Sequence, residues 1–133
     1  EAPADDTKFD VSMDDQFLST KKVADMTKAA VSTVTRRIAK NEMLGFRVFK
    51  KKWRIPKDQF QNGDVIKGIT EIIRLFDGDH KEAWYFLSAP LFYGDSDPRP
   101  IDRLRAVKGQ KEFDDCLRSL TAVQDSYERG DHF

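Results

Sequence analysis

The 133-residue sequence predicts a mainly α-helical protein in which two short helices and a small β-hairpin precede a bundle of four helices. Apolar residues recur three and four apart between residues 20 and 40 and again beyond residue 65, which is the spacing of a buried helix face. Between these stretches, residues 44–55 alternate apolar and polar side chains, as a strand with one exposed face does. This order of elements is that of a winged helix-turn-helix with a hairpin wing, followed by a C-terminal helical bundle.

Charge is distributed unevenly along the chain. The sequence has 23 Lys plus Arg and 23 Asp plus Glu, so the formal net charge is zero. Residues 1–16 hold one basic and six acidic residues, residues 17–57 hold twelve and two, and residues 58–133 hold ten and fifteen. A protein that binds nucleic acid needs excess positive charge where it meets the phosphates. The middle block has such an excess, and the neutral total therefore does not exclude DNA binding.

The first half begins with a tail and two helices. Residues 1–16 combine acidic charge with few large apolar groups, and we expect an acidic flexible tail there. Ser19 or Thr20 can cap a first helix, and a second helix follows from about 32 to 40 after a short turn at 28–31. The residues expected to face the core of these helices are Val23, Ala24, Thr27, Val34 and Ile38.

A hairpin and a linker complete the first half. The alternating run from Leu44 is interrupted by three consecutive lysines and resumes at 53–55, which predicts a small hairpin with a cationic tip. Pro56 ends the second strand and can begin a short helix through Phe60. Residues 61–64 are the expected linker between a first domain at 17–60 and a second domain at 65–133.

The second half predicts four helices joined by short loops. One apolar stripe runs from Val65 to Phe76 with Asp64 as a cap, and Asp79 caps the next helix. Pro100 suits the first turn of a third helix. The last helix has a face formed by Phe113, Cys116, Leu117, Leu120 and Val123.

Few residues could carry catalysis. His80 and His132 are far apart, Cys116 lies on an apolar stripe, and there is no paired Cys/His spacing, glycine-rich phosphate loop or nucleophile motif. We therefore predict that the protein is not an enzyme and that it binds neither a cofactor nor a metal ion. The single cysteine cannot form an internal disulfide, which fits the cytoplasm. No apolar run approaches the roughly 20 residues that are needed to cross a bilayer, so we expect no membrane partner.

The basic block contains the candidate functional residues. A helix in the major groove presents the exposed residues of its first turns to base edges, and here these are Ser32, Thr33, Thr35 and Arg36. Lysines at a hairpin tip can serve solubility alone, but here they coincide with a helix-turn-helix pattern and a basic block. The residues expected to bind phosphates are Arg37, Lys40, Arg47, Lys50, Lys51, Lys52 and Arg54.

Three segments of this block resemble the excisionase/MerR-type winged helix-turn-helix: Leu18–Met26, Ser32–Ile38 and Trp53–Asp58. In that family the second segment opens the recognition helix and the third closes the wing, so the resemblance implies a DNA-binding domain. Two residues depart from the family pattern. Lys22 replaces a common Glu, and Lys28 stands where a turn glycine is usual, which carries a cost if the turn needs a left-handed backbone.

The second half resembles the toxin-binding domain of Xre/MbcA/ParS-type antitoxins, on the segments Ala83–Leu87, Pro90, Gly94, Pro100–Leu104 and Gly109 with Phe113 and Leu117. It lacks the usual double glycine before the proline. Such domains follow a DNA-binding module and bind RES-domain toxins that attack NAD. Trp84 shares a helical stripe with Leu87, which favours the core, and the apolar run 91–93 fits an interface or a lid equally well. The resemblance implies partner-binding candidates at Trp84, Tyr85, Leu91, Phe92, Tyr93, Arg129, Asp131, His132 and Phe133.

Together these features predict a dimeric antitoxin that binds operator DNA, neutralises a protein toxin and represses its own operon. Two alternatives stay open. A recombination-directionality protein, or a phage or plasmid regulator, would use the second half only to oligomerise. A protein-binding adaptor would apply the basic face to an acidic protein and would not bind DNA.

Overall fold

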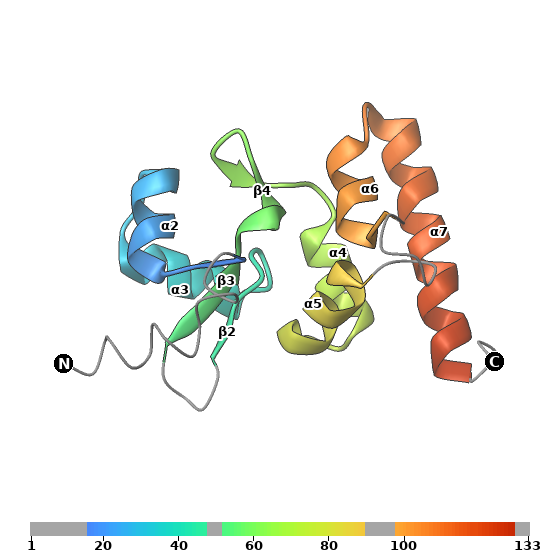
Figure 1. Cartoon of the computed structure of the whole chain (residues 1–133), viewed down its shortest axis with the longest axis horizontal. Helices are drawn as coiled ribbons and strands as arrows, with labels where there is room; N and C mark the ends of the chain where they lie inside the picture. The colour runs from blue at the N-terminus through green and yellow to red at the C-terminus, as the bar shows by residue number, and fades with distance from the viewer. Residues whose placement is uncertain (1–15, 48–51, 90–97, 130–133) are drawn as a thin grey trace. The chain divides into compact units, whose positions relative to one another are not determined.

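The computed structural model describes residues 16–47, 52–89 and 98–129, with side chains as far as Asp125. The fold is mainly helical with a small antiparallel sheet, as the sequence predicts. The chain divides into two compact units, Glu1–Val65 (unit 1) and Ile66–Phe133 (unit 2). Figure 1 shows the six α-helices that the described residues form. None of these helices combines the length and the apolar character needed to cross a bilayer.

Unit 1 packs two helices against a three-stranded antiparallel sheet (Figure 1). The helices are α2 (Thr20–Thr27) and α3 (Val31–Ala39), close to their expected positions. The sheet has the order β1 (Phe17–Leu18), β3 (Trp53–Pro56), β2 (Phe46–Arg47), and β2 and β3 form the expected hairpin. Strand β1 was not expected, because its partner β3 lies almost 40 residues further along the chain.

Local caps explain where α2 begins and ends. Ser19 is the N-cap, and its Oγ accepts a hydrogen bond from the amide of Lys22 at 3.1 Å, so this expectation is confirmed. At the other end, Lys28 has φ 57° and ψ 46°, and the amide of Ala29 donates to the carbonyl of Ala24 at 2.9 Å. This is the left-handed Schellman ending that glycine usually occupies. Lys28 therefore adopts the backbone conformation that glycine would adopt without a steric cost.

We expect Lys28→Gly to raise the free energy of unfolding of unit 1 by about 0.5–1 kcal/mol. Glycine removes the steric cost of the left-handed backbone, and this gain exceeds the free energy lost because the unfolded chain becomes more flexible. Native-state hydrogen exchange at the amides of Val23 and Ala24 measures this change. Lys22→Gly, within α2, is the matched control and should lower the same free energy by up to about 1 kcal/mol. Slower exchange in both variants, or in neither, would contradict the assignment of strain to Lys28.

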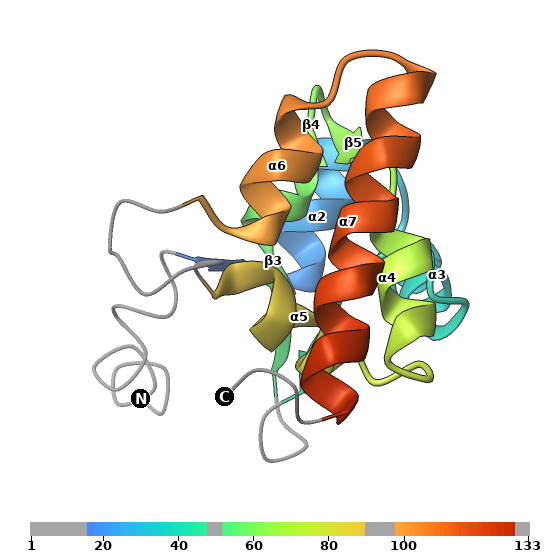
Figure 2. The same ribbon diagram turned by 90° about the vertical axis from the view of Figure 1, so that its right-hand side faces the viewer.

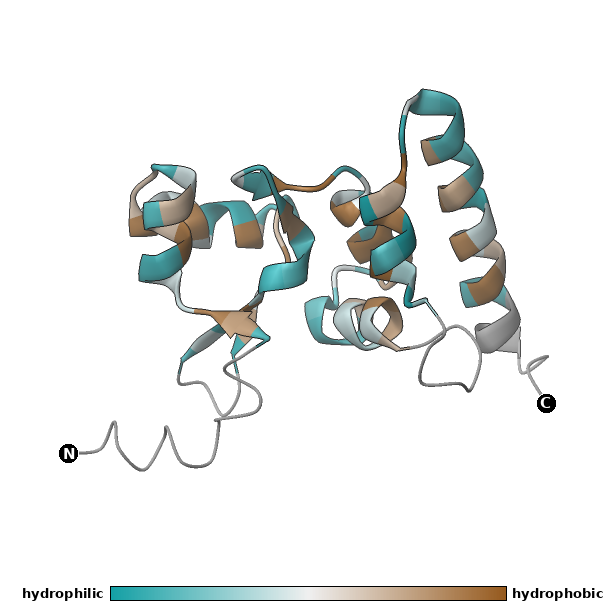
Figure 3. Cartoon of the chain, turned by 45° about the horizontal axis from the view of Figure 1, so that its top comes forward, coloured by the Kyte–Doolittle hydropathy of each residue, from teal (hydrophilic) through white to brown (hydrophobic). Residues whose placement is uncertain are grey.

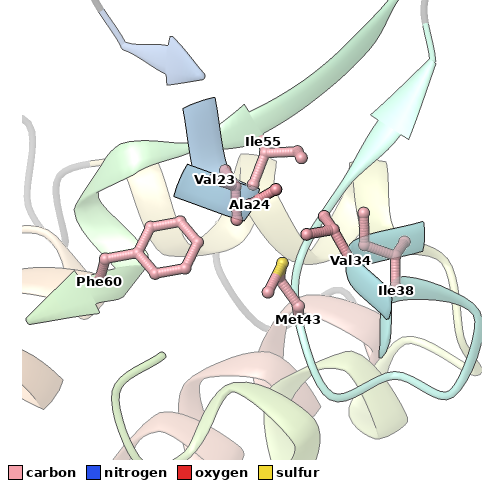
Figure 4. Packing of buried hydrophobic residues seen from close by; sticks show 7 residues of the cluster. All are labelled: Val23, Ala24, Val34, Ile38, Met43, Ile55 and Phe60. Atoms are coloured by element: carbon pink, nitrogen blue, oxygen red, sulfur yellow. The ribbon is translucent and has the colours of Figure 1, made fainter. Parts of the chain in front are cut away.

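The core of unit 1 draws side chains from both helices, the sheet and the loop after α3 (Figure 4). The helices supply Val23, Ala24, Val34 and Ile38, each at most 5% exposed, whereas the fifth expected residue, Thr27, is half-buried. Gly45 lies so close to this core that a Cβ atom there would stand 2.5 Å from Cδ1 of Ile38. The buried cluster consists of Val23, Ala24, Val34, Ile38, Met43, Ile55 and Phe60.

The short helix expected at 56–60 forms as a 3-10 helix of three residues, whereas the expected linker at 61–64 is part of a second hairpin. A 3-10 turn, Lys57–Gln59, leads into β4 (Phe60–Gln61), which pairs antiparallel with β5 (Asp64–Val65). The connecting residues Asn62 and Gly63 have φ values of 56° and 82°. Asn-Gly is the favoured pair for a two-residue hairpin turn with positive φ at both positions, and this is the physical reason for the hairpin.

Unit 2 contains the four expected helices. They are α4 (Ile69–Leu75), α5 (His80–Ser88), α6 (Pro100–Ala106) and α7 (Gln110–Arg129). Figure 2 shows α6 and α7 side by side, and Figure 3 shows apolar positions recurring along α7. Asp79 caps α5, since its Oδ1 accepts a hydrogen bond from the amide of Glu82 at 3.1 Å. Both this cap and Pro100 in the first turn of α6 confirm the expectation.

Helix α4 begins later than the apolar stripe predicts. Asp64 and Val65 belong to β5, and the Asp64 carboxylate accepts from the amide of Val65 at 2.7 Å rather than capping a helix. The helix starts only after Gly68, whose φ of 106° is incompatible with an α-helical residue. The apolar residues before Gly68 therefore do not extend the buried face of α4.

Candidate nucleic-acid interface

Helix α3 has a polar face opposite its buried side chains. Val34 and Ile38 are buried, whereas Ser32, Arg36 and Lys40 are exposed and Thr33 is half-buried. No ion pair joins Arg36 to another side chain that the structure describes. Helix α3 also contains no acidic residue, so this face carries uncompensated positive charge.

Thr35 lies at the border between the two faces of α3. Its side chain is half-buried, and its Oγ1 donates a hydrogen bond to the carbonyl of Ser32 at 3.1 Å. The hydroxyl proton is thereby used within the helix. Among the four residues expected to read bases, Thr35 is the one whose donor is already engaged.

Arg37 is occupied by acidic side chains of its own unit. Its Nη1 lies 3.2 Å from Oδ1 of Asp64, and its Nε lies 3.7 Å from Oε1 of Glu42. A phosphate would compete with these two carboxylates for Arg37, and the expected phosphate contact of Arg37 stays a prediction. The pairs join α3 to the β4–β5 hairpin, and as partly exposed pairs they contribute at most about 1 kcal/mol each.

Arg54 also differs from its expected place on the surface. It lies in β3, the central strand of the sheet, and is only 8% exposed. The two residues after it, Ile55 and Pro56, are buried as well. Arg54 is thus much less exposed than Arg47 and Lys52, and its expected phosphate contact stays a prediction.

The base of the β2–β3 hairpin presents Arg47 and Lys52 at the surface. Arg47 and Trp53 are cross-strand partners, and the guanidinium carbon lies 5.1 Å from the indole ring centroid. This cation–π contact restricts the orientation of the Arg47 side chain. Lys50 and Lys51, expected at the tip of the same hairpin, lie outside the described residues.

The candidate partner-binding residues of unit 2 have different surroundings. Trp84 is 3% exposed, so it is a core residue rather than a surface contact, because the buried stripe of α5 includes it together with Ala83 and Leu87. Tyr85 is 54% exposed. The remaining candidates, Leu91, Phe92, Tyr93, Asp131, His132 and Phe133, and the side chain of Arg129, lie outside what the structure describes.

Among the described side chains of unit 2, three titratable groups have shifted pKa values. Burial raises the pKa of the Cys116 thiol, so it is protonated at neutral pH and behaves as a small apolar side chain. Burial also lowers the pKa of His80, and the Asp79 carboxylate opposes this shift. Hydrogen bonds from the Arg99 guanidinium, the shorter at 2.9 Å, lower the pKa of Asp102. No group of three His, Cys, Asp or Glu in the described residues is arranged to hold a metal ion.

Gln59, which the sequence pattern does not single out, positions elements of the candidate interface. It is fully buried, and its Oε1 accepts from the amide of Leu44 at 2.7 Å. Its Nε2 donates to the carbonyls of Leu44 and Pro56 at 2.8 and 3.1 Å. Gln59 therefore ties the chain after α3 to the end of β3, and no local pattern in the sequence signals this.

These features define a mainly helical protein of two units whose first unit has an exposed basic face. The fold is similar to that in the NMR structure of Rv2175c, with a TM-score of 0.55 and 18% sequence identity over 82% of this chain and 79% of that chain. At this identity the likeness concerns the fold alone. No protein-family model matches the sequence, and no curated protein matches it.

Proposed function

We propose that unit 1 is a winged helix-turn-helix that binds duplex DNA, with α3 as the recognition helix and the β2–β3 hairpin as the wing. The observation that carries the proposal is the polar face of α3, where Ser32, Arg36 and Lys40 are exposed and no acidic residue lies in the helix. Arg47 and Lys52 add positive charge at the base of the hairpin. Arg36 is the candidate for base recognition, and Lys40, Arg47 and Lys52 are the candidates for phosphates.

We further propose that unit 2 binds a protein partner and joins two chains, so that the protein is an autorepressing antitoxin. The sequence resemblance of Ala83–Leu87 and Pro100–Leu104 supports this assignment, and the exposed Tyr85 offers an aromatic contact of the kind that protein interfaces favour. Two associated chains would suit an operator with two half-sites.

We expect Arg36→Ala to weaken binding to a preferred duplex by about 1–3 kcal/mol while changing binding to random DNA much less, because a fork of donors to guanine carries sequence information. The preferred duplex is one recovered from a randomised 20-base-pair pool by the full chain, and fluorescence anisotropy measures both affinities. Arg118→Ala is the matched control, since Arg118 is an exposed arginine of unit 2 paired with Asp115. An equal loss on preferred and random DNA would remove Arg36 from base recognition.

Lys52→Ala gives the contrasting pattern in the same assay. Both affinities should fall by the same factor, and the dependence of log K on log salt should flatten by about 0.9, the contribution of one phosphate contact. Absence of any salt-dependent affinity in the unaltered chain would favour the adaptor that does not bind DNA.

Co-expression of the full chain with the product of the adjacent gene tests the role of unit 2. The antitoxin proposal expects a stable complex and recovery of growth when the neighbouring product is toxic. A chain that binds DNA and oligomerises but forms no such complex would favour the recombination or phage regulator.

A further inference from the structure

Val31 is a large apolar side chain that the core of unit 1 does not use. It is the first residue of α3 and is 45% exposed. Val34 and Ile38 of the same helix belong to the buried cluster, but Val31 is neither in that cluster nor among the partly buried residues packed against it. In the described part of the chain, Val31 and Tyr85 are the two large apolar side chains that are exposed.

The start of α3 is also not arranged for helix stability. The N-cap is Ala30, which forms no side-chain capping bond, whereas Ser19 at the start of α2 does. Serine, threonine, asparagine or aspartate at an N-cap is normally favoured, and a β-branched valine is a weak helix former. Positions where a chain forgoes available stability are often those that serve binding.

The neighbourhood of Val31 has the charge that duplex DNA requires. Ser32 and Arg36 lie on the exposed face of α3, and all twelve basic residues of the middle block fall within unit 1. The residues of the first turn of a recognition helix reach the base edges. On those edges the 5-methyl group of thymine is the one apolar substituent, while the nitrogen and oxygen groups donate or accept hydrogen bonds.

We propose that Val31 contacts the 5-methyl group of a thymine in the major groove and thereby selects that base at one position of each half-site. This inference rests on the proposed function of unit 1 and adds a residue that determines its specificity. The contact removes apolar surface of both groups from water, and opposite another base Val31 would cover a polar group that it cannot satisfy.

Deoxyuridine differs from thymidine only by this methyl group, so it provides the test. Each thymidine of the preferred duplex is replaced in turn, and binding of the full chain is measured by anisotropy. We expect one position per half-site at which the replacement weakens binding about fourfold, the factor for one methyl group left in water. In Val31→Ala the effect at that position should disappear, whereas Val31→Ile should retain it.

Each outcome decides between the proposals. The inference is overturned if no position responds to deoxyuridine, or if the response persists in Val31→Ala. It is also overturned if Val31→Ala weakens binding to the thymidine duplex and to the deoxyuridine duplex by the same factor, as a role of Val31 in protein–protein contact would. In these cases the preferred duplex is still bound, and the DNA-binding function stands. If the randomised pool returns no preferred duplex, the base-reading function fails and the inference fails with it. Equal circular dichroism spectra of the variants exclude unfolding as the cause.

Discussion

Gln59→Leu is expected to lower the free energy of unfolding of unit 1 by at least about 3 kcal/mol, because it leaves three buried polar groups without their partner. These groups are the amide and carbonyl of Leu44 and the carbonyl of Pro56. Each unsatisfied group costs about 1–3 kcal/mol, and a small domain has only about 5–15 kcal/mol in total. We therefore expect unit 1 to be largely unfolded in this variant at moderate temperature.

Gln59→Glu separates the loss of hydrogen bonds from a change of shape. The side chain keeps its size and still offers an oxygen to the Leu44 amide, but a second oxygen then faces the two carbonyls that Nε2 satisfied. This variant should also be destabilised, since a buried carboxylate loses hydration and meets two acceptors. Gln110→Leu, at an exposed position of α7, is the control and should stay within about 0.5 kcal/mol.

Native-state hydrogen exchange within α2 and α3 measures these effects in the full chain. A Gln59→Leu variant whose protection equals that of the unaltered chain would show that Leu44 and Pro56 find other partners. The consequence for DNA binding is indirect. Because Gln59 joins the segment after α3 to the end of β3, its loss should release the β2–β3 hairpin from α3 even where both still form.

Most helices of the fold follow from local sequence. Ser19 and Asp79 are caps with the expected hydrogen bonds, and Pro100 starts α6, because such signals act within one helical turn. The late start of α4 also has a local cause, since Gly68 interrupts an apolar stripe that is otherwise continuous. The hairpin at 60–65 was within reach of sequence reasoning through the Asn62-Gly63 pair.

The candidate interface was less predictable, because it depends on distant neighbours. Arg36 and Arg37 are adjacent in the sequence, but only Arg37 meets Asp64, which lies 27 residues further along the chain. Arg54 is only 8% exposed in β3, whose position at the centre of the sheet depends on the distant pairing of β1 with β3. Charge type and helical spacing locate the basic face, whereas the tertiary contacts decide which of its arginines are available.

Gly68→Ala is expected to destabilise unit 2 by about 2–5 kcal/mol through two separate effects. The residue has φ 106°, a backbone conformation that residues with a side chain rarely adopt. A Cβ atom would also lie 3.0 Å from Cδ2 of Leu104 and 3.1 Å from Cε1 of Phe113, both of which are buried. The backbone strain costs about 1–3 kcal/mol, and the overpacking adds a similar amount unless these side chains move.

Comparison with Gly109→Ala isolates the contribution of overpacking. Gly109 has φ 89°, but a Cβ atom there meets no atom within 4 Å, so the variant carries backbone strain without a clash. Both substitutions reduce the entropy of the unfolded chain equally, and this contribution cancels in the comparison. Hydrogen exchange within α4, α6 and α7 should therefore be faster in Gly68→Ala than in Gly109→Ala, and the difference measures the packing of Leu104 and Phe113. Equal rates in the two variants would mean that these side chains yield without cost and that Gly68 is required by its backbone conformation alone.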